Sequence, residues 1–454
     1  MEVDVRAALD RLAVRLEGRD ARVVQAGRLS GGASMETWAF EVVAPRAKDR
    51  MIRDRMILRR RTVPFDPETA RSVSLAVEAA LIKAARANGA LAPPVLHVCD
   101  DEDGLGEAYV MGAVPGETLG RKIVSDPAFD AVRPKLARQC GEVLARIHAT
   151  PPPPELALKT VDAVAELDRY EEVYRSTGAE RPILELAFQY LRRRAPEPVP
   201  PVLLHGDFRN GNIMFDPETG VAAVLDWELA HIGDPAEDMG WICTNSWRFG
   251  RPEKPVGGFG DYADLLAGYA AAGGRPIPPR ARPLLAGAGL AALGRHVPDH
   301  VHELADRPRE VGRAPDDRPP RLRDRSRPRR PPGAGPMITH PKTEELVQAV
   351  ALWIDQIRPS LDPRSAFLAR VAANVLSVVE RELTQGPAAE GRAVEAMSRL
   401  LGHEGDFAAL NGELCAKIRS GEFTVDTPGL LEALGAMARD QLAIDQPKYR
   451  PEVG

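Results

Sequence analysis

Residues 205–215 read HGDFRNGNIMF, and this stretch decides how the chain is expected to fold around its polar residues. The apolar run 202–204 precedes it, and the apolar run VAAVLDW follows at 221–227. A loop that carries polar residues between buried strands is typical of a functional site. NIMF, the turn DPETG and VAAVLD predict a β-hairpin, whose open ends should bring Asn212 and Asp226 together.

Three oxygen-bearing side chains meet at this predicted loop and hairpin. An amide oxygen from Asn212 beside the carboxylate of Asp226 suits a hard cation such as Mg²⁺, which prefers oxygen ligands. Asp207 stands at the head of the same loop, where it could accept a proton from an incoming hydroxyl or orient it. Phosphoryl transfer requires these parts, because it depends on positioning and on neutralising charge.

HGDFRNGN followed by LDWE resembles the catalytic motif of the aminoglycoside phosphotransferase-like family, whose members are relatives of protein kinases and choline kinases. The resemblance implies that Asp207 is the catalytic residue, that Asn212 and Asp226 bind the metal, and that the cofactors are ATP and Mg²⁺. It also implies an α+β, bilobal protein-kinase-like fold with a small antiparallel sheet in the N-lobe and a mostly helical C-lobe. The chain has no GxxxxGK[ST] sequence, so a P-loop enzyme is excluded.

The resemblance extends to an arginine in the third predicted strand. Arg59 in MILRRR stands where many members have a phosphate-binding Lys, and Glu78 matches its helix partner. Arginine does not simply replace lysine, but it is common in the subgroup related to the kinase-like domains of acyl-CoA dehydrogenase fusions. We therefore interpret Arg59 as a subgroup feature. The other implied residues are Gly31, Gly32 and Ser34 in a nucleotide-covering turn, Val110 and Met111 in the hinge beside adenine, and His205, Asn210, Asp234 and Asp238 in supporting positions.

The chain divides into four predicted segments. Residues 1–112 form the nucleotide-binding N-lobe, with strands within 22–63, a helix ending at Gly89 and two further strands. Residues 113–275 form the C-lobe with the catalytic loop and metal site, although the C-terminal helices typical of the family are missing from the sequence. Residues 276–336 form an Arg/Pro-rich linker, and residues 337–454 form an all-helical domain with helix stops near Gly386, Gly402 and Gly421. This last domain resembles an uncharacterised helical bacterial family encoded near such phosphotransferases.

The linker has an unusual composition. Residues 275–336 contain 14 Arg and 13 Pro but no Lys, Asn, Gln, Thr, Cys, Phe, Tyr or Trp, so the segment is predicted to be disordered. Out-of-frame translation of a GC-rich gene produces this bias. We therefore hypothesise a frameshift near residue 280, with a second reading frame beginning around Met337. A metal site at His296, His300 and His302 is not expected, because this segment offers no scaffold to orient the three side chains.

Several protein classes are excluded by composition. A net charge of −5 gives no general attraction to nucleic acid or anionic membranes, and no apolar run is long enough to span a bilayer. Four separated cysteines without a CxxC pair fit a reduced, cytoplasmic protein. His205 is expected to be structural, whereas His231 could either line a substrate cleft or be satisfied within its loop. Trp227, Trp241 and Trp247 are expected to pack in the core.

Two functional hypotheses follow. The first is an ATP- and magnesium-dependent phosphotransferase that acts on a hydroxyl group of a small molecule. The alternative is a catalytically impaired kinase-like binding protein, with the helical domain acting as an interaction module for a protein partner. The substrate stays open, and a hydroxy acid or an acyl-linked alcohol is indicated by subgroup analogy alone.

Overall fold

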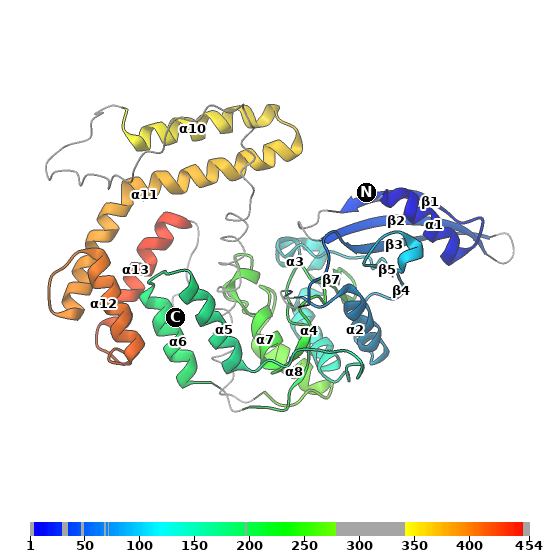
Figure 1. Cartoon of the computed structure of the whole chain (residues 1–454), viewed down its shortest axis with the longest axis horizontal. Helices are drawn as coiled ribbons and strands as arrows, with labels where there is room; N and C mark the ends of the chain where they lie inside the picture. The colour runs from blue at the N-terminus through cyan, green and yellow to red at the C-terminus, as the bar shows by residue number, and fades with distance from the viewer. Residues whose placement is uncertain are drawn as a thin grey trace, which may run out of the picture. The chain divides into compact units, whose positions relative to one another are not determined.

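The computed structural model describes residues 4–29, 35–46, 50–67, 70, 72–195, 198–277 and 341–447 (Figure 1). The chain forms two units: Met1–Tyr174 with Arg194–Pro298, and Arg175–Arg193 with Asp299–Gly454. Residues 278–336 of the linker, with its three histidines, lie outside the described residues, so the predicted disorder and the frameshift stay predictions.

The first unit begins with a helix and an antiparallel sheet. Helix α1 (Val5–Glu17) precedes five strands in the order β1-β2-β3-β5-β4, and every neighbouring pair is antiparallel. A cluster that includes Leu9, Phe40 and Leu58 forms the core between the helix and the sheet. This confirms the predicted small sheet. The strands are β1 (Arg22–Leu29), β2 (Met35–Arg46), β3 (Arg50–Arg61), β4 (Val95–Val98) and β5 (Ala108–Gly112).

Helix α2 (Leu75–Ala87) lies against this sheet and carries a buried acid. The Ser74 side chain accepts a hydrogen bond from Val77 N and starts the helix, as N-cap residues commonly do. The predicted stop at Gly89 is confirmed, since this glycine follows the last turn with φ 84°. The buried face of α2 includes Glu78, which is fully enclosed and must therefore have polar partners.

A mostly helical lobe completes the first unit. Its helices are α3 (Gly120–Ser125), α4 (Arg133–His148), α5 (Ala163–Ser176), α7 (Ala236–Ile242) and α8 (Tyr262–Ala271). Helices α4 and α8 cross so closely that a Cβ atom on Gly141 would lie 2.0 Å from the Leu265 carbonyl oxygen. Short strands β6 (Val202–Leu204) and β9 (His231–Gly233) pair beside them. The predicted hairpin is β7 (Ile213–Asp216) and β8 (Gly220–Val224).

The second unit includes one helix from the middle of the chain. Helix α6 (Pro182–Arg193) packs Leu186 into a core with Met397, Leu410 and Leu414. Gln189 Nε2 also donates hydrogen bonds to the carbonyls of Ile418 and Phe423, at 2.7 and 2.9 Å. The other helices are α10 (Thr343–Ile357), α11 (Pro363–Leu401), α12 (Phe407–Ser420) and α13 (Leu430–Asp445). None of the described helices has the length and apolarity needed to cross a bilayer.

The predicted helix stop near Gly386 is wrong. Helix α11 runs for 39 residues through Gly386 and Pro387 without ending. Contacts on both sides hold it: Arg381 Nε donates to the Ile444 carbonyl before the pair, and Arg392 forms an ion pair with Asp440 after it. Tertiary contacts therefore override two residues that usually end a helix. The stops at Gly402 and Gly421 are confirmed, with φ 79° and 82°.

Candidate active site

A buried carboxylate holds the loop between β6 and β7. Asp238 on α7 accepts from His205 N at 2.8 Å and from Gly206 N at 2.9 Å, and His148 Nε2 lies 3.2 Å from it. Burial alone would raise the pKa of Asp238, but the hydrogen bond from His148 and the neighbouring positive and donor groups keep this pKa below its usual value. Asp238, which the sequence analysis assigned to a supporting position, thus binds the backbone of the predicted catalytic loop.

Both ring nitrogens of His205 contact backbone groups. Its Nε2 donates to the Leu225 carbonyl at 2.9 Å, and its Nδ1 accepts from the Asp207 backbone N–H at 3.2 Å. The ring is fully buried and packs edge-on against Trp227. Because both ring nitrogens bind backbone groups, His205 shapes the loop and has no free nitrogen to contact a hydroxyl substrate.

Asp207 itself is fixed by three side chains. Trp241 Nε1 and Arg209 Nε donate to Oδ1 at 2.5 and 3.0 Å, while Asn212 Nδ2 donates to Oδ2 at 2.6 Å. The Arg209 guanidinium also lies 4.4 Å from the centroid of the Trp247 ring. The sequence did not identify Arg209 or Trp241 as site residues. Trp241 is buried as predicted, but its indole N–H also contacts the predicted catalytic carboxylate.

The hairpin brings the ends of its strands together. Leu225 N donates to the Asn212 carbonyl at 2.7 Å, which sets the backbone of Asn212 beside that of Asp226. Asp226 has φ 64°, a left-handed conformation that a residue other than glycine rarely adopts. Such strain is common where a side chain must be directed into a functional site. Because Nδ2 of Asn212 is bound to Asp207, Oδ1 is the amide atom that suits a cation.

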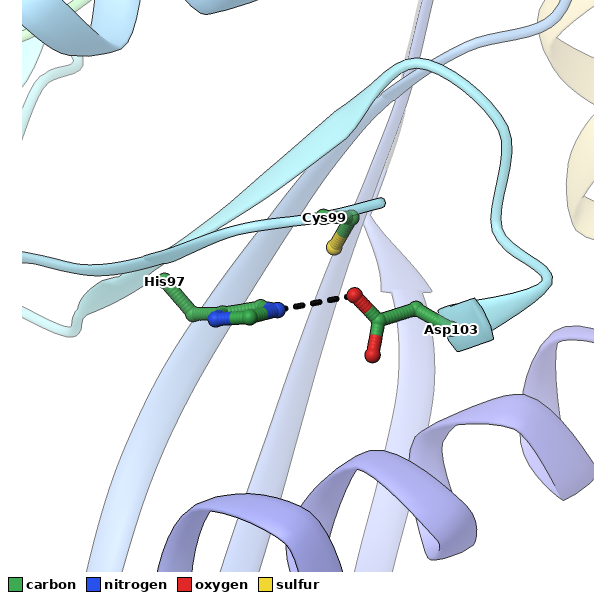
Figure 2. Close-up of side chains that lie close together, drawn as sticks. All are labelled: His97, Cys99 and Asp103. Atoms are coloured by element: carbon green, nitrogen blue, oxygen red, sulfur yellow. Dashed lines mark hydrogen bonds and ion pairs between the residues drawn. The ribbon is translucent and has the colours of Figure 1, made fainter. Parts of the chain in front are cut away.

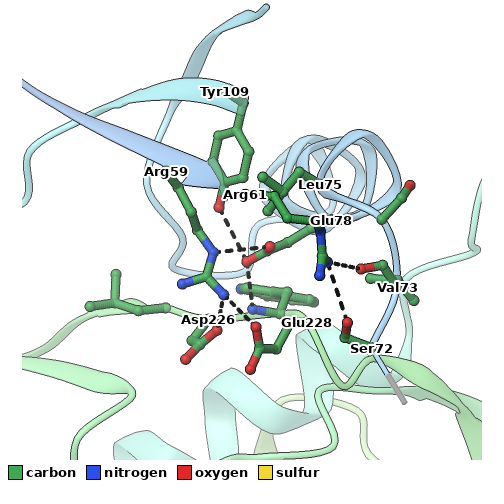
Figure 3. A network of polar contacts seen from close by, with 12 residues as sticks. Arg59, Arg61, Ser72, Val73, Leu75, Glu78, Tyr109, Asp226 and Glu228 are labelled. Carbon is green, nitrogen blue, oxygen red and sulfur yellow. Dashed lines mark hydrogen bonds and ion pairs between the residues drawn. The ribbon is translucent and has the colours of Figure 1, made fainter. Parts of the chain in front are cut away.

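Arg59 occupies the centre of a network of acids (Figure 3). Its Nε donates to Glu78 at 3.1 Å, and one Nη atom donates to both Asp226 and Glu228, at 2.5 and 2.8 Å. Glu78 in turn accepts from Tyr109 Oη at 3.2 Å. The structure therefore joins three residues that the sequence analysis assigned to the site, Arg59, Glu78 and Asp226, and adds Glu228 to them.

The charges of this network favour a cation. Burial raises the pKa of Glu78 to about 7 although Arg59 acts against the rise. Burial and the charge of Asp226 raise the pKa of Glu228, and Asp207 contributes in the same direction. Asp226 and Asp207 therefore both disfavour the charged form of Glu228. Carboxylate and amide oxygens such as those of Asp226 and Asn212 are the donors that Mg²⁺ prefers.

The predicted hinge lies on strand β5. Val110 is buried opposite Leu58 of β3, and Met111 is half-buried opposite Ile57. Gly112, at the end of β5, donates its backbone N–H to the Pro94 carbonyl, and a Cβ atom there would lie 2.9 Å from Pro94 Cγ. The close approach of Pro94 explains the glycine. Gly31, Gly32 and Ser34 lie outside the described residues.

Two other predicted supporting residues hold backbone groups. Asn210 Nδ2 donates to the carbonyls of Trp247 and Gly257 at 2.9 and 2.7 Å, which anchors the loop that follows Asp207. Asp234 accepts from Ala236 N at 2.8 Å at the start of α7, and burial raises the pKa of its carboxyl.

His231 is satisfied within its loop. Its Nδ1 lies 2.9 Å from the Leu229 carbonyl, and its Nε2 lies 3.2 Å from Glu237. Burial lowers the pKa of His231, but the hydrogen bond and charge of Glu237 outweigh it and raise this pKa to about 9. Of the two interpretations left open by the sequence, the geometry supports the structural one.

A separate group of potential metal ligands lies in the N-lobe (Figure 2). Ligand atoms of His97, Cys99 and Asp103 are all within 4.8 Å of one another. Asp103, however, already binds the Arg15 guanidinium at 2.8 Å and accepts from Asp100 N at 2.9 Å. Both oxygens of Asp103 are occupied by Arg15, His97 and the Asp100 backbone, so this group is better explained as the contact that fastens α1 to the β4–β5 connection.

Comparison with known proteins identifies both parts of the chain. A sequence model described as the phosphotransferase enzyme family matches residues 26–284, which is more than half of the chain. The chain belongs to the phosphotransferase enzyme family. A second model, a domain of unknown function (DUF6285), matches residues 359–449 of the chain. Both resemblances inferred from the sequence are confirmed.

Curated relatives are much longer than the matched region. Acyl-CoA dehydrogenase family member 10 from Mus musculus is 30% identical over 178 residues, and the match covers 36% of this chain and 16% of the relative. Acyl-CoA dehydrogenase family member 11 from Homo sapiens is 31% identical over 155 residues, 32% of this chain and 20% of the relative. The chain thus matches about a sixth to a fifth of the length of these relatives.

Solved structures share lower sequence identity. A macrolide 2'-phosphotransferase type I is 19% identical, with 67% of this chain and 95% of that chain covered and a TM-score of 0.44. A microcompartment-associated aminopropanol kinase is 16% identical, with 64% and 90% covered and a TM-score of 0.41.

Proposed function

We propose that this phosphotransferase transfers the γ-phosphate of ATP to a hydroxyl group of a small molecule in a magnesium-dependent reaction. The observation that carries the proposal is the fixed orientation of Asp207, whose carboxylate is held by Trp241, Arg209 and Asn212 at the head of the loop. A carboxylate held in this way can accept the hydroxyl proton or orient the hydroxyl toward the phosphate. Positioning of this kind is the main contribution of a protein to phosphoryl transfer.

The cofactor proposal rests on the donor set beside Asp207. Asn212 Oδ1 and the Asp226 carboxylate would hold Mg²⁺, which would neutralise charge on the phosphates. Arg59 now binds Asp226, and it would remain anchored by Glu78 and Glu228 when Asp226 turns to a cation. Glu78 is therefore proposed as the residue that positions Arg59 for contact with phosphate.

The acceptor proposal uses the cation beside Asp207. The Arg209 guanidinium binds Asp207 and stacks on Trp247, so an entering acceptor meets a positive charge next to the predicted catalytic carboxylate. Such a charge favours an acceptor with negative charge or an acyl oxygen near its hydroxyl and disfavours a polycation. A hydroxy acid or an acyl-linked alcohol fits this pattern, and the names of the curated relatives point to acyl chemistry as well.

A panel assay with Asp207→Asn tests the proposal. The wild type should phosphorylate hydroxy acids or their thioesters in preference to amino sugars when ATP and Mg²⁺ are supplied. Asp207→Asn should lose about 10²–10⁴-fold in turnover, because the amide cannot accept the proton. Its thermal stabilisation by Mg-ATP should persist, since ligand at 100 times Kd adds about 2.7 kcal/mol.

The outcomes separate the two functional hypotheses. Normal turnover by Asp207→Asn would show that the role assigned to this residue is wrong. A wild type that neither turns over nor gains stability from Mg-ATP would favour the impaired, kinase-like binding protein. If only amino sugars are phosphorylated, the kinase hypothesis stands, but the proposed acceptor class of hydroxy acids or acyl-linked alcohols is wrong.

A further inference from the structure

The predicted catalytic carboxylate already has three hydrogen-bond partners in the structure. Oδ1 of Asp207 accepts from Trp241 Nε1 at 2.5 Å and from Arg209 Nε at 3.0 Å, while Oδ2 accepts from Asn212 Nδ2 at 2.6 Å. Each carboxylate oxygen has about two acceptor positions. Both positions of Oδ1 are therefore filled, and a hydroxyl can use this oxygen only after one of its two donors leaves.

Arg209 is the donor that can leave Oδ1. Trp241 is 6% exposed and packs edge-on against Trp247, so its indole cannot turn away without moving the core around it. The Arg209 side chain is 25% exposed, and a partly exposed arginine has many rotamers to adopt. Access of an acceptor to Oδ1 of Asp207 is therefore controlled by Arg209.

The guanidinium of Arg209 keeps an unused donor beside Asp207. Its Nη1 donates to the Asn210 carbonyl at 3.0 Å, and its central carbon lies 4.4 Å from the centroid of the Trp247 ring. Nη2 forms no hydrogen bond with any described residue. Nε and Nη2 make up one edge of the guanidinium, and such an edge binds a carboxylate through two parallel hydrogen bonds. An acceptor carboxylate on this edge takes Nε from Asp207, and the stack on Trp247 can stay in place.

We propose that Arg209 selects the acceptor by covering Asp207 until an anionic group of the acceptor draws the guanidinium away. This inference rests on the proposed function and adds a means of selection to it. Once Nε has left, Oδ1 accepts the proton of the acceptor hydroxyl, the hydroxyl oxygen bonds to the γ-phosphorus of ATP, and ADP leaves. Water carries no charge to displace Arg209, so Asp207 stays covered and ATP is hydrolysed slowly when no acceptor is bound.

ATP hydrolysis without an acceptor provides the first test. Arg209→Met removes the donors and keeps a long side chain against Trp247, so Oδ1 opens to water and hydrolysis should rise about fivefold. The matched control is Arg169→Met. Arg169 also lies 4.4 Å from the centroid of an aromatic ring, that of Tyr170, and pairs with Glu166, but it belongs to α5 outside the site. Its variant should hydrolyse ATP at the wild-type rate.

A hydroxy acid from the acceptor panel and its methyl ester provide the second test, because they share the hydroxyl and differ in charge. The wild type should have a higher kcat/KM for the acid. Arg209→Met should lower this value about 10–100-fold, through KM and not kcat, because charged hydrogen bonds to the acceptor are lost. The values for the ester should not fall, and KM for ATP should not change. Arg209→Lys should recover part of the preference, since it restores the charge but not the planar guanidinium.

Calorimetric titration measures binding separately from turnover. With Mg²⁺ and the β,γ-imido analogue of ATP present, the acid should bind Arg209→Met about 10–100-fold more weakly than the wild type. The ATP analogue itself should bind both proteins equally, because Arg209 is assigned to the acceptor and not to the phosphates.

Three results would overturn this role of Arg209 and leave the proposed kinase in place. They are unchanged hydrolysis by Arg209→Met, an unchanged preference of that variant for the acid, and weaker binding of the ATP analogue in place of the acid. A wild type that phosphorylates no hydroxyl compound in the panel would instead reject the proposed function, and the role of Arg209 with it.

Discussion

Replacing Asp238 by Asn tests the contact that holds the catalytic loop. The carboxylate accepts from His205 N, from Gly206 N and from His148, but an amide has a single accepting oxygen. At least one of these buried donors must then face an NH₂ group. A hydrogen bond to a charged group contributes about 1.5–3 kcal/mol, and a buried donor without a partner costs about 1–3 kcal/mol. The variant should therefore lose roughly 3 kcal/mol or more of unfolding free energy.

Calorimetry and turnover measure this loss together. For a domain of this size each kcal/mol lowers the melting temperature by about 2–4 °C, so a decrease of roughly 6–12 °C is expected. Turnover should fall as well, because His205 and Gly206 directly precede Asp207. The control is Asp216→Asn in the exposed hairpin turn. There one oxygen accepts all three hydrogen bonds, from Glu218 N, Thr219 N and Thr219 Oγ1, and the amide can keep them.

The two measurements refute different parts of the reasoning. If Asp238→Asn melts no lower than Asp216→Asn, the hydrogen bonds to Asp238 do not stabilise the fold as argued. If stability falls while turnover per folded molecule is unchanged, Asp238 supports the fold but does not position Asp207.

Three further predictions test other parts of the structure. Gly141→Ala should prevent folding or cost at least about 3 kcal/mol of unfolding free energy, because α4 and α8 leave no room for a methyl group. Gly391→Ala, in open space on α11, should instead add about 0.5–1 kcal/mol of unfolding free energy, and melting temperatures distinguish the two variants. Leu186→Ala should lower the stability of the C-terminal helices by about 2–5 kcal/mol, measured as a shift in their urea midpoint, and no shift would mean that α6 is not part of that core. His231 holds its proton more tightly in the fold than in the unfolded chain, with a pKa of about 9 against 6.5. The stabilisation by protonated His231, at most about 3 kcal/mol, is complete below pH 6.5 and is lost as the pH rises through 9. The wild type should therefore lose more stability over this range than His231→Asn. Equal losses would contradict the raised pKa of His231.

The parts of the site that lie on one short stretch of chain were predictable. Asp207, Asn212 and the hairpin before Asp226 are within twenty residues, so turn chemistry and strand patterns place them without knowledge of the rest of the fold. Arg59 and Glu78 came from family resemblance, and the structure joins them to Asp226.

Contacts between distant segments were not predictable in the same way. Trp241 reaches Asp207 because α7 folds back beside the loop, and its sequence indicates only a buried aromatic residue. Helix α6 is amphipathic, which predicts that it has a buried face but does not identify what covers it. Gly386 and Pro387 favour a helix end locally, and contacts from α13 overrule them.

The position of α6 in the sequence affects how the chain folds during its synthesis. The hydrogen bond from Gln189 to Ile418 cannot form until Ile418 is translated, 229 residues later. At about 5–20 residues per second the delay is roughly 10–50 s. During this interval the apolar side of α6 is without its final neighbours. The nascent chain therefore passes through a stage in which it is vulnerable to proteases and aggregation. A chaperone that shields exposed helices at the ribosome should raise the yield of folded protein.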